Sequence, residues 1–175
     1  YSAITKIQAA KSDIIIMSLS ADQAANFVKA MDESGLRIPV VSDYPPPPYI
    51  FENQVGQQAG RIGLVRGTFF IDNPNMTDRQ KTFVAEFEPK AAEAVGEAHS
   101  TTHWDLTSYD AVHLVADALK RGGPKPDSFA KAMSATKHDG LLGHYEFDQD
   151  RTVKPEGLPF IFIKDMPGGK LEVFQ

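Results

Sequence analysis

The sequence has 175 residues, of which 42% are hydrophobic and 23% charged, a balance typical of a globular domain with its own core. Its net charge is -5 and it has no basic run, which argues against nucleic acid or an anionic membrane as a partner, because both need concentrated positive charge. It contains no cysteine, so disulfides, thiolate metal sites and thiol nucleophiles are excluded. No apolar run approaches the ~20 residues of a transmembrane helix.

The first 72 residues predict alternating strands and helices. An apolar strand at Ile14–Met17 precedes Ser20 and Gln23, whose spacing is that of a capping box at the start of a helix. One face of that helix carries the apolar residues Ala24, Phe27, Val28 and Met31. Further short strands are predicted at Ile38–Val41 and Gly67–Asp72. Uninterrupted apolar strands joined through amphipathic helices indicate a parallel sheet covered on both faces.

The middle of the chain is predicted to be helical and the tail to form strands. Thr77–Gln80 is another capping box. Between Asp105 and Arg121 apolar residues occur on several helical faces, which predicts a buried helix; they are Tyr109, Ala111, Val112, Leu114, Val115 and Ala116. Strands are expected over Tyr145–Asp148 and Phe160–Ile163. We do not expect these three regions to pack together around a single hydrophobic core.

The start of the chain is unusual. Tyr1 stands where an initiator methionine is expected, no signal peptide follows, and Ala3–Ala10 already has the pattern of a helix. We therefore expect the sequence to be a mature or truncated piece whose beginning lies elsewhere.

Four segments together resemble the carboxyl-terminal half of the type I periplasmic solute-binding proteins, the leucine/isoleucine/valine-binding family of branched-chain amino-acid ABC transporters. Ile4–Ile15 resembles the family's segment of a helix followed by an apolar strand, and Phe27–Leu36 is similar to its next helix. Ser108–Leu119 resembles the family's helix that begins Tyr-Asp-Ala, and Gly140–Asp148 resembles its glycine-rich hairpin. No single motif is highly specific, but the occurrence of all four in the family's order and spacing is specific to the family.

The resemblance implies an α/β protein with the type I periplasmic binding protein fold. That fold has two Rossmann-like lobes, each with a parallel sheet flanked by helices, linked by three crossovers and closing on a ligand. It assigns residues 1–72 to the second lobe, residues 73–156 to a mainly helical return to the first lobe, and residues 157–175 to the final crossover and terminal strands. Only the second half of the fold is then present.

Residues that follow the first two strands are the candidates for ligand binding, because ligands of open α/β sheets bind beyond the carboxyl ends of the strands. Ser18, Ser20 and Ala21 open a helix whose N–H groups and dipole suit a carboxylate. The resemblance implies an acid after the second strand that pairs with a ligand ammonium. Asp43 matches it in chemistry, although the alignment could shift by one residue to Tyr44. The family often has an aromatic residue where this chain has Ser20, so the ligand's identity stays open.

Trp104, the only tryptophan, precedes the predicted buried helix. The resemblance places it near the cleft, where it would cover the apolar part of a ligand, and a position in the core or at a hinge fits the sequence equally. Asp105 and Ser20 also suit helix caps. His113 is expected to be a hydrogen-bonded core residue.

The leading hypothesis is a periplasmic, non-enzymatic solute-binding component of an ABC importer, without cofactor or metal. The resemblance implies two partners: a small ligand, either a branched-chain type of amino acid or a similar small carboxylate, and a membrane permease. Apolar surface left by the missing amino-terminal half would be covered by that half or by self-association. Two alternatives remain: the extracellular ligand-sensing domain of a receptor with the same fold, and a metal-dependent enzyme using His99, His103 and Asp105.

Overall fold

The computed structural model describes residues 2–42, 62–67, 69–71, 73–158, 161–166 and 170–173. The chain forms two compact units. Unit 1 comprises Tyr1–Gly67 and Phe160–Gln175, and unit 2 comprises Thr68–Pro159. In these ranges, no helix combines the length and the apolar character that crossing a membrane requires.

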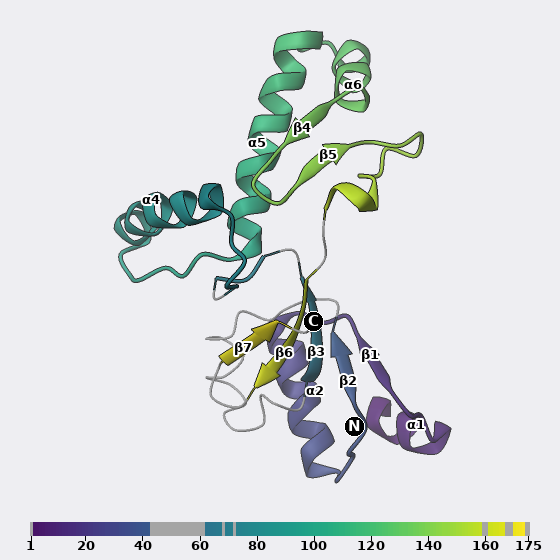
Figure 1. Ribbon diagram of the computed structural model, residues 1–175. Coiled ribbons are helices and arrows are strands. Elements are labelled where there is room, and N and C mark those ends of the chain that lie inside the picture. The colour runs from purple at the N-terminus through teal and green to yellow at the C-terminus, as the bar shows by residue number, and fades with distance from the viewer. Residues whose placement is uncertain are drawn as a thin grey trace. The chain divides into compact units, whose positions relative to one another are not determined.

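Unit 1 is built on a five-stranded sheet in the order β1-β2-β3-β6-β7 (Figure 1). Its strands are β1 (Ile15–Met17), β2 (Val40–Ser42), β3 (Ile62–Gly67), β6 (Ile161–Met166) and β7 (Lys170–Val173). The first three run parallel, whereas β6 pairs with β3 and β7 pairs with β6 in antiparallel fashion. The predicted parallel α/β arrangement is therefore confirmed.

Helix α2 (Ala21–Glu33) packs its predicted apolar stripe against one face of this sheet; α1 is Ser2–Ala10. The fully or nearly fully buried residues of the two layers are Ala24, Ala25, Val28 and Met31 from α2 and Ile15, Met17 and Val40 from the sheet. Ser20 is the N-cap, and its backbone N–H donates to Gln23 Oε1 at 3.4 Å. Gly35 follows the helix with a φ of +67°, a conformation that glycine adopts without steric cost. Both predicted helix boundaries are thus confirmed.

The strand predicted at Gly67–Asp72 is misplaced, because the observed β3 ends at Gly67. Phe69 and Phe70 are 3% and 5% exposed without being part of a strand. The Phe70 carbonyl accepts a hydrogen bond from the Asn73 N–H at 3.1 Å, which turns the chain. The apolar run predicted a strand, but Phe69 belongs instead to the core of unit 2.

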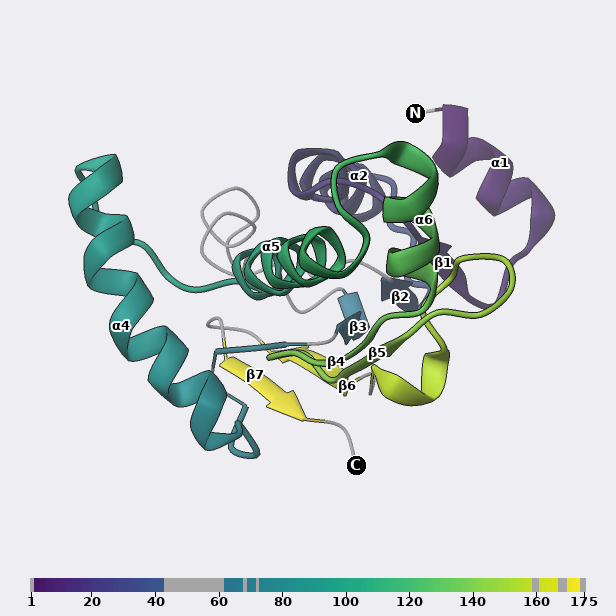
Figure 2. The same cartoon turned by 90° about the horizontal axis from the view of Figure 1, so that it is seen from above.

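Unit 2 is organised around the long helix α5 (His103–Gly122), with α6 (Pro126–Ser134) and the hairpin of β4 (Lys137–Asp139) and β5 (His144–Glu146) alongside it (Figure 2). Helix α4 is Asp78–Val95, and η2 (Pro155–Gly157) follows the hairpin. The core consists of Phe69, Leu106, Leu141 and Leu142, with Ile71, Met76, Phe83, Val84 and Leu158 packed against it.

A buried carboxylate fastens the hairpin to α5. Asp110 is 1% exposed and accepts hydrogen bonds from the Leu141 N–H at 2.7 Å, the Leu142 N–H at 3.0 Å and the Tyr145 hydroxyl at 2.9 Å. Burial first, and then the negative charge of Asp110, raise the pKa of Tyr145 above its ordinary 10.0, which keeps the hydroxyl protonated as a donor. The aspartate of the Tyr-Asp-Ala motif is therefore a structural residue in this chain.

Only one face of α5 is covered, which contradicts the prediction of a helix buried on several sides. The buried stripe consists of Leu106, Asp110, Leu114 and Ala118, four residues apart. The other faces carry exposed apolar side chains, among them Tyr109 at 42%, Val112 at 68% and Val115 at 42% exposed. His113 is also exposed, so the expected core histidine is wrong. Within the described residues of unit 2, no layer covers the apolar residues on these faces.

Candidate functional site

In unit 1 the carboxyl ends of two parallel strands lie next to each other. The register pairs Met17 at the end of β1 with Ser42 at the end of β2. Ser18 and Ser20 follow β1 and are exposed, whereas Ser42 is fully buried. The chain therefore presents hydroxyl groups where ligands of open α/β sheets bind. The other two predicted ligand residues of this edge, Asp43 and Tyr44, lie outside the described residues.

The start of α2 adds a second feature to this edge. Ser20 has an extended backbone, and its carbonyl accepts the Ala24 N–H at 2.8 Å, so Ala21 is the first helical residue. The first N–H groups of a helix have no intrahelical acceptor and carry the positive end of its dipole. An anionic ligand group beyond β1 would meet these N–H groups together with the exposed Ser18 and Ser20. The structure thus brings together three of the predicted residues, all in unit 1.

Trp104 lies in the first turn of α5, in unit 2, and is 51% exposed. Its ring stands 4.5 Å from the His103 ring, centroid to centroid. Asp105 has the capping role that the sequence favours: its Oδ2 accepts from the Thr102 N–H at 2.7 Å and from the Thr102 hydroxyl at 2.8 Å. Trp104 thus presents half of its surface at a firmly capped helix start.

The residues of the metal-site alternative do not converge. His99 Nε2 lies 3.2 Å from Asp105 Oδ2, whereas His103 packs on the neighbouring tryptophan. Across the ranges that the structure describes, no group of three or more histidine, aspartate or glutamate side chains is arranged to hold a metal ion. The geometry gives this alternative no support.

The His103–Trp104 contact leads to a pH prediction. Burial lowers the pKa of His103 below 6.5, and the charge of Asp105 opposes this shift more weakly. We expect a neutral imidazole beside Trp104 at pH 7 and a drop in Trp104 fluorescence with a midpoint below pH 6.5, because imidazolium quenches indole emission. His103 binds a proton more readily in the unfolded chain, so its contribution to folding stability is present above pH 6.5 and is lost as the pH falls toward the folded-state pKa.

A fluorescence titration of the protein between pH 8 and 4.5 measures this midpoint. We expect His103→Gln to abolish the pH-dependent change in Trp104 fluorescence. His138→Gln, on the β4 strand, is expected to leave this change in place. A midpoint at or above 6.5, or an unchanged step in His103→Gln, contradicts the assignment.

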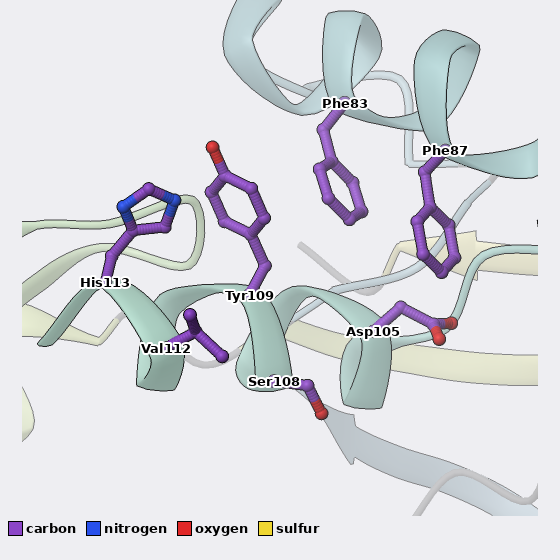
Figure 3. Close-up of a pocket in the computed structure, with 7 residues that line it drawn as sticks. All are labelled: Phe83, Phe87, Asp105, Ser108, Tyr109, Val112 and His113. Carbon is purple, nitrogen blue, oxygen red and sulfur yellow. The ribbon is translucent and has the colours of Figure 1, made fainter. Parts of the chain in front are cut away.

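Sequence reasoning missed a pocket between α4 and α5 (Figure 3). It has a volume of about 340 Å³ and is lined by Phe83, Phe87, Asp105, Ser108, Tyr109, Val112 and His113. The Phe83 and Phe87 rings stack with their centroids 5.0 Å apart, and the Phe83 and Tyr109 rings meet in an edge-type contact with centroids 5.1 Å apart. The four-residue spacing of Phe83 and Phe87 on one helix was the available signal, but spacing alone does not separate a pocket wall from a core.

The family model described as periplasmic binding protein matches residues 1–158. The chain belongs to the periplasmic binding protein family. A search of curated proteins finds no sequence match.

Solved structures of other periplasmic binding proteins show the same fold. The branched-chain amino acid transporter substrate-binding protein from Streptococcus pneumoniae, in complex with isoleucine, is 21% identical, with a TM-score of 0.71 over 99% of this chain and 47% of its own. An ABC transporter solute-binding protein from R. palustris, in complex with benzoate, is 19% identical, with a TM-score of 0.69 over 99% and 45%. A fatty acid ABC transporter substrate-binding protein from Thermomonospora curvata is 16% identical, with a TM-score of 0.73 over 99% and 45%.

These comparisons establish the type I periplasmic binding protein fold and its extent in this chain. The chain spans about half the length of the solved structures that it matches, from 45% to 51%. At these identities the likeness shows the fold alone. Branched-chain amino-acid solute-binding proteins recur among the structural neighbours, as the sequence resemblance implied.

Proposed function

We propose that this protein is the periplasmic solute-binding component of an ABC importer and that it binds a small carboxylate, most simply an amino acid of the branched-chain type. The observation that carries the proposal is the pair of adjacent parallel strand ends beside the α2 N-terminus in a chain of this family. The protein acts by binding and release. The ligand bridges two lobes and shifts the population toward the closed form.

The carboxylate of the ligand is the group that α2 recognises in this proposal. The ligands named for three related structures are isoleucine, benzoate and a fatty acid, which differ in size and polarity but share a carboxyl group. Backbone N–H groups at a helix start bind a carboxylate whatever it is attached to. Ser18 and Ser20 add hydroxyl donors at the same edge. The constant part of the ligand would thus be held by the backbone, and side chains would select the variable part.

In this proposal, Asp43 and Trp104 determine which carboxylate ligands are bound. Asp43 follows Ser42, the end of β2, whose neighbour in the register is the end of β1. A carboxylate at this point pairs with the ammonium of an amino acid and disfavours a ligand that lacks one, because its own charge is then left without a partner. The half-exposed indole of Trp104 offers an apolar cover. Tyr44 is the alternative ligand contact at the same edge.

Two compact units agree with a mechanism of hinge closure, because each has its own core and can move as a body. We assign unit 1 to one lobe and unit 2 to the other. Discharge of the ligand to a membrane permease completes the proposed transport step.

Asp43→Asn tests the assignment in the full-length protein that carries this sequence. We expect the Kd for isoleucine or leucine, measured by isothermal titration calorimetry, to rise at least about 30-fold, which corresponds to the ~2 kcal/mol lost when one partner of a desolvated charge pair is removed. Asp150→Asn, an exposed aspartate in the turn after β5, is the matched control and leaves the Kd unchanged.

The ligand panel separates the parts of this proposal. Benzoate and a medium-chain fatty acid are titrated beside the amino acids. Unchanged amino-acid affinity in Asp43→Asn refutes the ammonium-binding role. Binding of benzoate or fatty acid, with no amino-acid binding in the wild type, keeps the carboxylate site and refutes the amino-acid ligand. No binding of any carboxylate refutes the function.

A further inference from the structure

The turn that precedes α5 is tied back to α4 by one carboxylate. Thr101 is 3% exposed, and its N–H and its hydroxyl both donate to Glu88 Oε1, at 2.8 and 3.0 Å. Glu88 lies on α4, 13 residues earlier in the chain. A single side-chain oxygen of α4 therefore accepts both donors of a buried residue in this turn.

His99 makes a second connection between the two helices. Its ring meets the Phe87 ring of α4 in an edge-type contact, with centroids 5.5 Å apart, and its Nε2 lies 3.2 Å from Asp105 Oδ2 on α5. Figure 3 shows Phe87 and Asp105 on these two helices. Because Asp105 also accepts the N–H and the hydroxyl of Thr102, the turn and the start of α5 are held together.

Trp104 lies inside the segment that these contacts hold. Thr102 is the N-cap of α5 and Asp105 is its third residue, so Trp104 stands between the two members of the capping box. The Thr107 hydroxyl donates to the carbonyl of His103 at 2.7 Å, which ties the backbone before Trp104 to the next turn. The backbone on both sides of the indole is thus fixed, although the side chain is 51% exposed.

Loss of Glu88 would release this segment at its first residue. A buried donor that loses its acceptor carries its full desolvation cost. Thr101 would therefore have to turn toward water or toward another acceptor. Trp104 follows Thr101 by three residues, so a rearrangement of the turn also displaces the start of α5 and its indole.

We infer that Glu88 is a positioning residue for Trp104, and that it presets the half-exposed indole for contact with a ligand. The inference rests on the proposed function in one respect, the role of Trp104 as the apolar cover of the ligand. Glu88 acts through the Thr101 turn and need not touch the ligand. A side chain that is already ordered loses less conformational entropy on binding, so its position contributes to affinity.

The position of Trp104 can be measured without a ligand. The full-length protein that carries this sequence is labelled with 5-fluorotryptophan, and the ¹⁹F resonance of Trp104 is assigned with Trp104→Phe. We expect Glu88→Ala to shift or split this resonance. Glu88→Gln keeps an acceptor oxygen and restores the wild-type resonance, and Glu86→Ala, an exposed glutamate on the same helix, leaves it unchanged.

A weaker variant protects the test against a failure of Glu88→Ala to fold, which circular dichroism would reveal. Thr101→Val removes the hydroxyl donor, keeps the N–H bond to Glu88 and preserves the shape of the side chain. We expect it to move the Trp104 resonance in the same direction by a smaller amount.

Affinity provides the second measurement. We expect Glu88→Ala to raise the Kd for leucine or isoleucine about 5-fold by isothermal titration calorimetry, the range expected when one side chain must be ordered on binding. Glu88→Gln is expected to stay within about 2-fold of the wild type. In a Trp104→Ala background Glu88→Ala should cause no further loss, because the residue through which it acts is gone.

The outcomes separate this inference from the proposed function. An unchanged Trp104 resonance in both Glu88→Ala and Thr101→Val overturns the positioning role, whatever the ligand. A 5-fold loss of affinity that persists in the Trp104→Ala background shows that Glu88 acts through another residue and also overturns it. An unchanged Kd in Trp104→Ala refutes the ligand contact of Trp104 in the proposed function, and with it the effect of Glu88 on affinity. A moved resonance together with a loss that vanishes in Trp104→Ala supports the inference.

Discussion

Asp110→Ala is expected to destabilise unit 2 by about 3–5 kcal/mol, since it leaves three buried donors without an acceptor. These donors are the Leu141 and Leu142 N–H groups and the Tyr145 hydroxyl, at 2.7, 3.0 and 2.9 Å from the carboxylate. The bonds cross from the middle of α5 to the β4–β5 turn and to β5 itself. Their loss therefore loosens the hairpin and also Leu141 and Leu142, which belong to the core of unit 2.

Urea unfolding, followed by far-UV circular dichroism and by the fluorescence of Trp104, measures this effect. Trp104 lies on the same helix as Asp110, so its signal reports on unit 2. Asp110→Asn keeps the side-chain shape and one acceptor oxygen and is expected to lose about half as much stability as Asp110→Ala.

Asp117→Ala is the matched control for this prediction. It removes an aspartate from the same helix whose side chain is 46% exposed and pairs with Arg121 at 2.8 Å. Exposed pairs of this kind contribute at most about 1 kcal/mol. Equal unfolding midpoints for Asp110→Ala and Asp117→Ala would show that the buried carboxylate does not stabilise the contact between the hairpin and α5.

Local patterns were enough to predict the elements whose partners are near in the sequence. The capping spacing of Ser20 and Gln23 and the stripe through Val28 and Met31 located α2, because both signals arise within one helix. The strand predicted at Gly67–Asp72 failed because an apolar run is the same signal whether its residues enter a sheet or, as Phe69 does, another core.

The role of Asp110 could not be read from the sequence. Its three donors follow it by 31 to 35 residues, and no local spacing connects them. The aspartate therefore stood out only as part of a family motif. The same limit applies to the candidate site. Chain order predicts that the ends of β1 and β2 adjoin, but the ligand-binding role proposed for Asp43 depends on contacts outside both strands.

The wrong prediction of burial for α5 has a different cause. Residues on its outer face, such as Val112 and Val115, are 68% and 42% exposed although they continue the apolar pattern of the helix. Apolar residues on several faces of a helix are a signal that burial usually produces, but the pattern alone does not identify the faces that are buried.

Gly140→Ala is the second substitution for which we expect a large effect, about 3 kcal/mol of lost stability, caused by crowding. A Cβ atom at Gly140 would lie 2.5 Å from Asp110 Oδ2, 2.6 Å from Asp110 Cγ and 2.6 Å from Tyr145 Cε2. The alanine therefore pushes against the same carboxylate that fastens the hairpin. Gly96→Ala separates crowding from backbone strain: Gly96 has a φ of +80° and no atom within 4 Å of its Cβ position, so its cost is about 1 kcal/mol.

A double-mutant cycle identifies the atoms responsible. In an Asp110→Ala background two of the three crowding atoms are gone, so Gly140→Ala is expected to cost at least about 1 kcal/mol less than it does in the wild type, a coupling typical of residues in contact. The cycle is measured by urea unfolding of the four proteins under one condition. Additive losses would show that the two residues act separately. A combined loss smaller than the sum of the two single losses shows that the glycine of the hairpin motif and the aspartate of the helix motif serve one physical requirement, the close approach of the hairpin to α5.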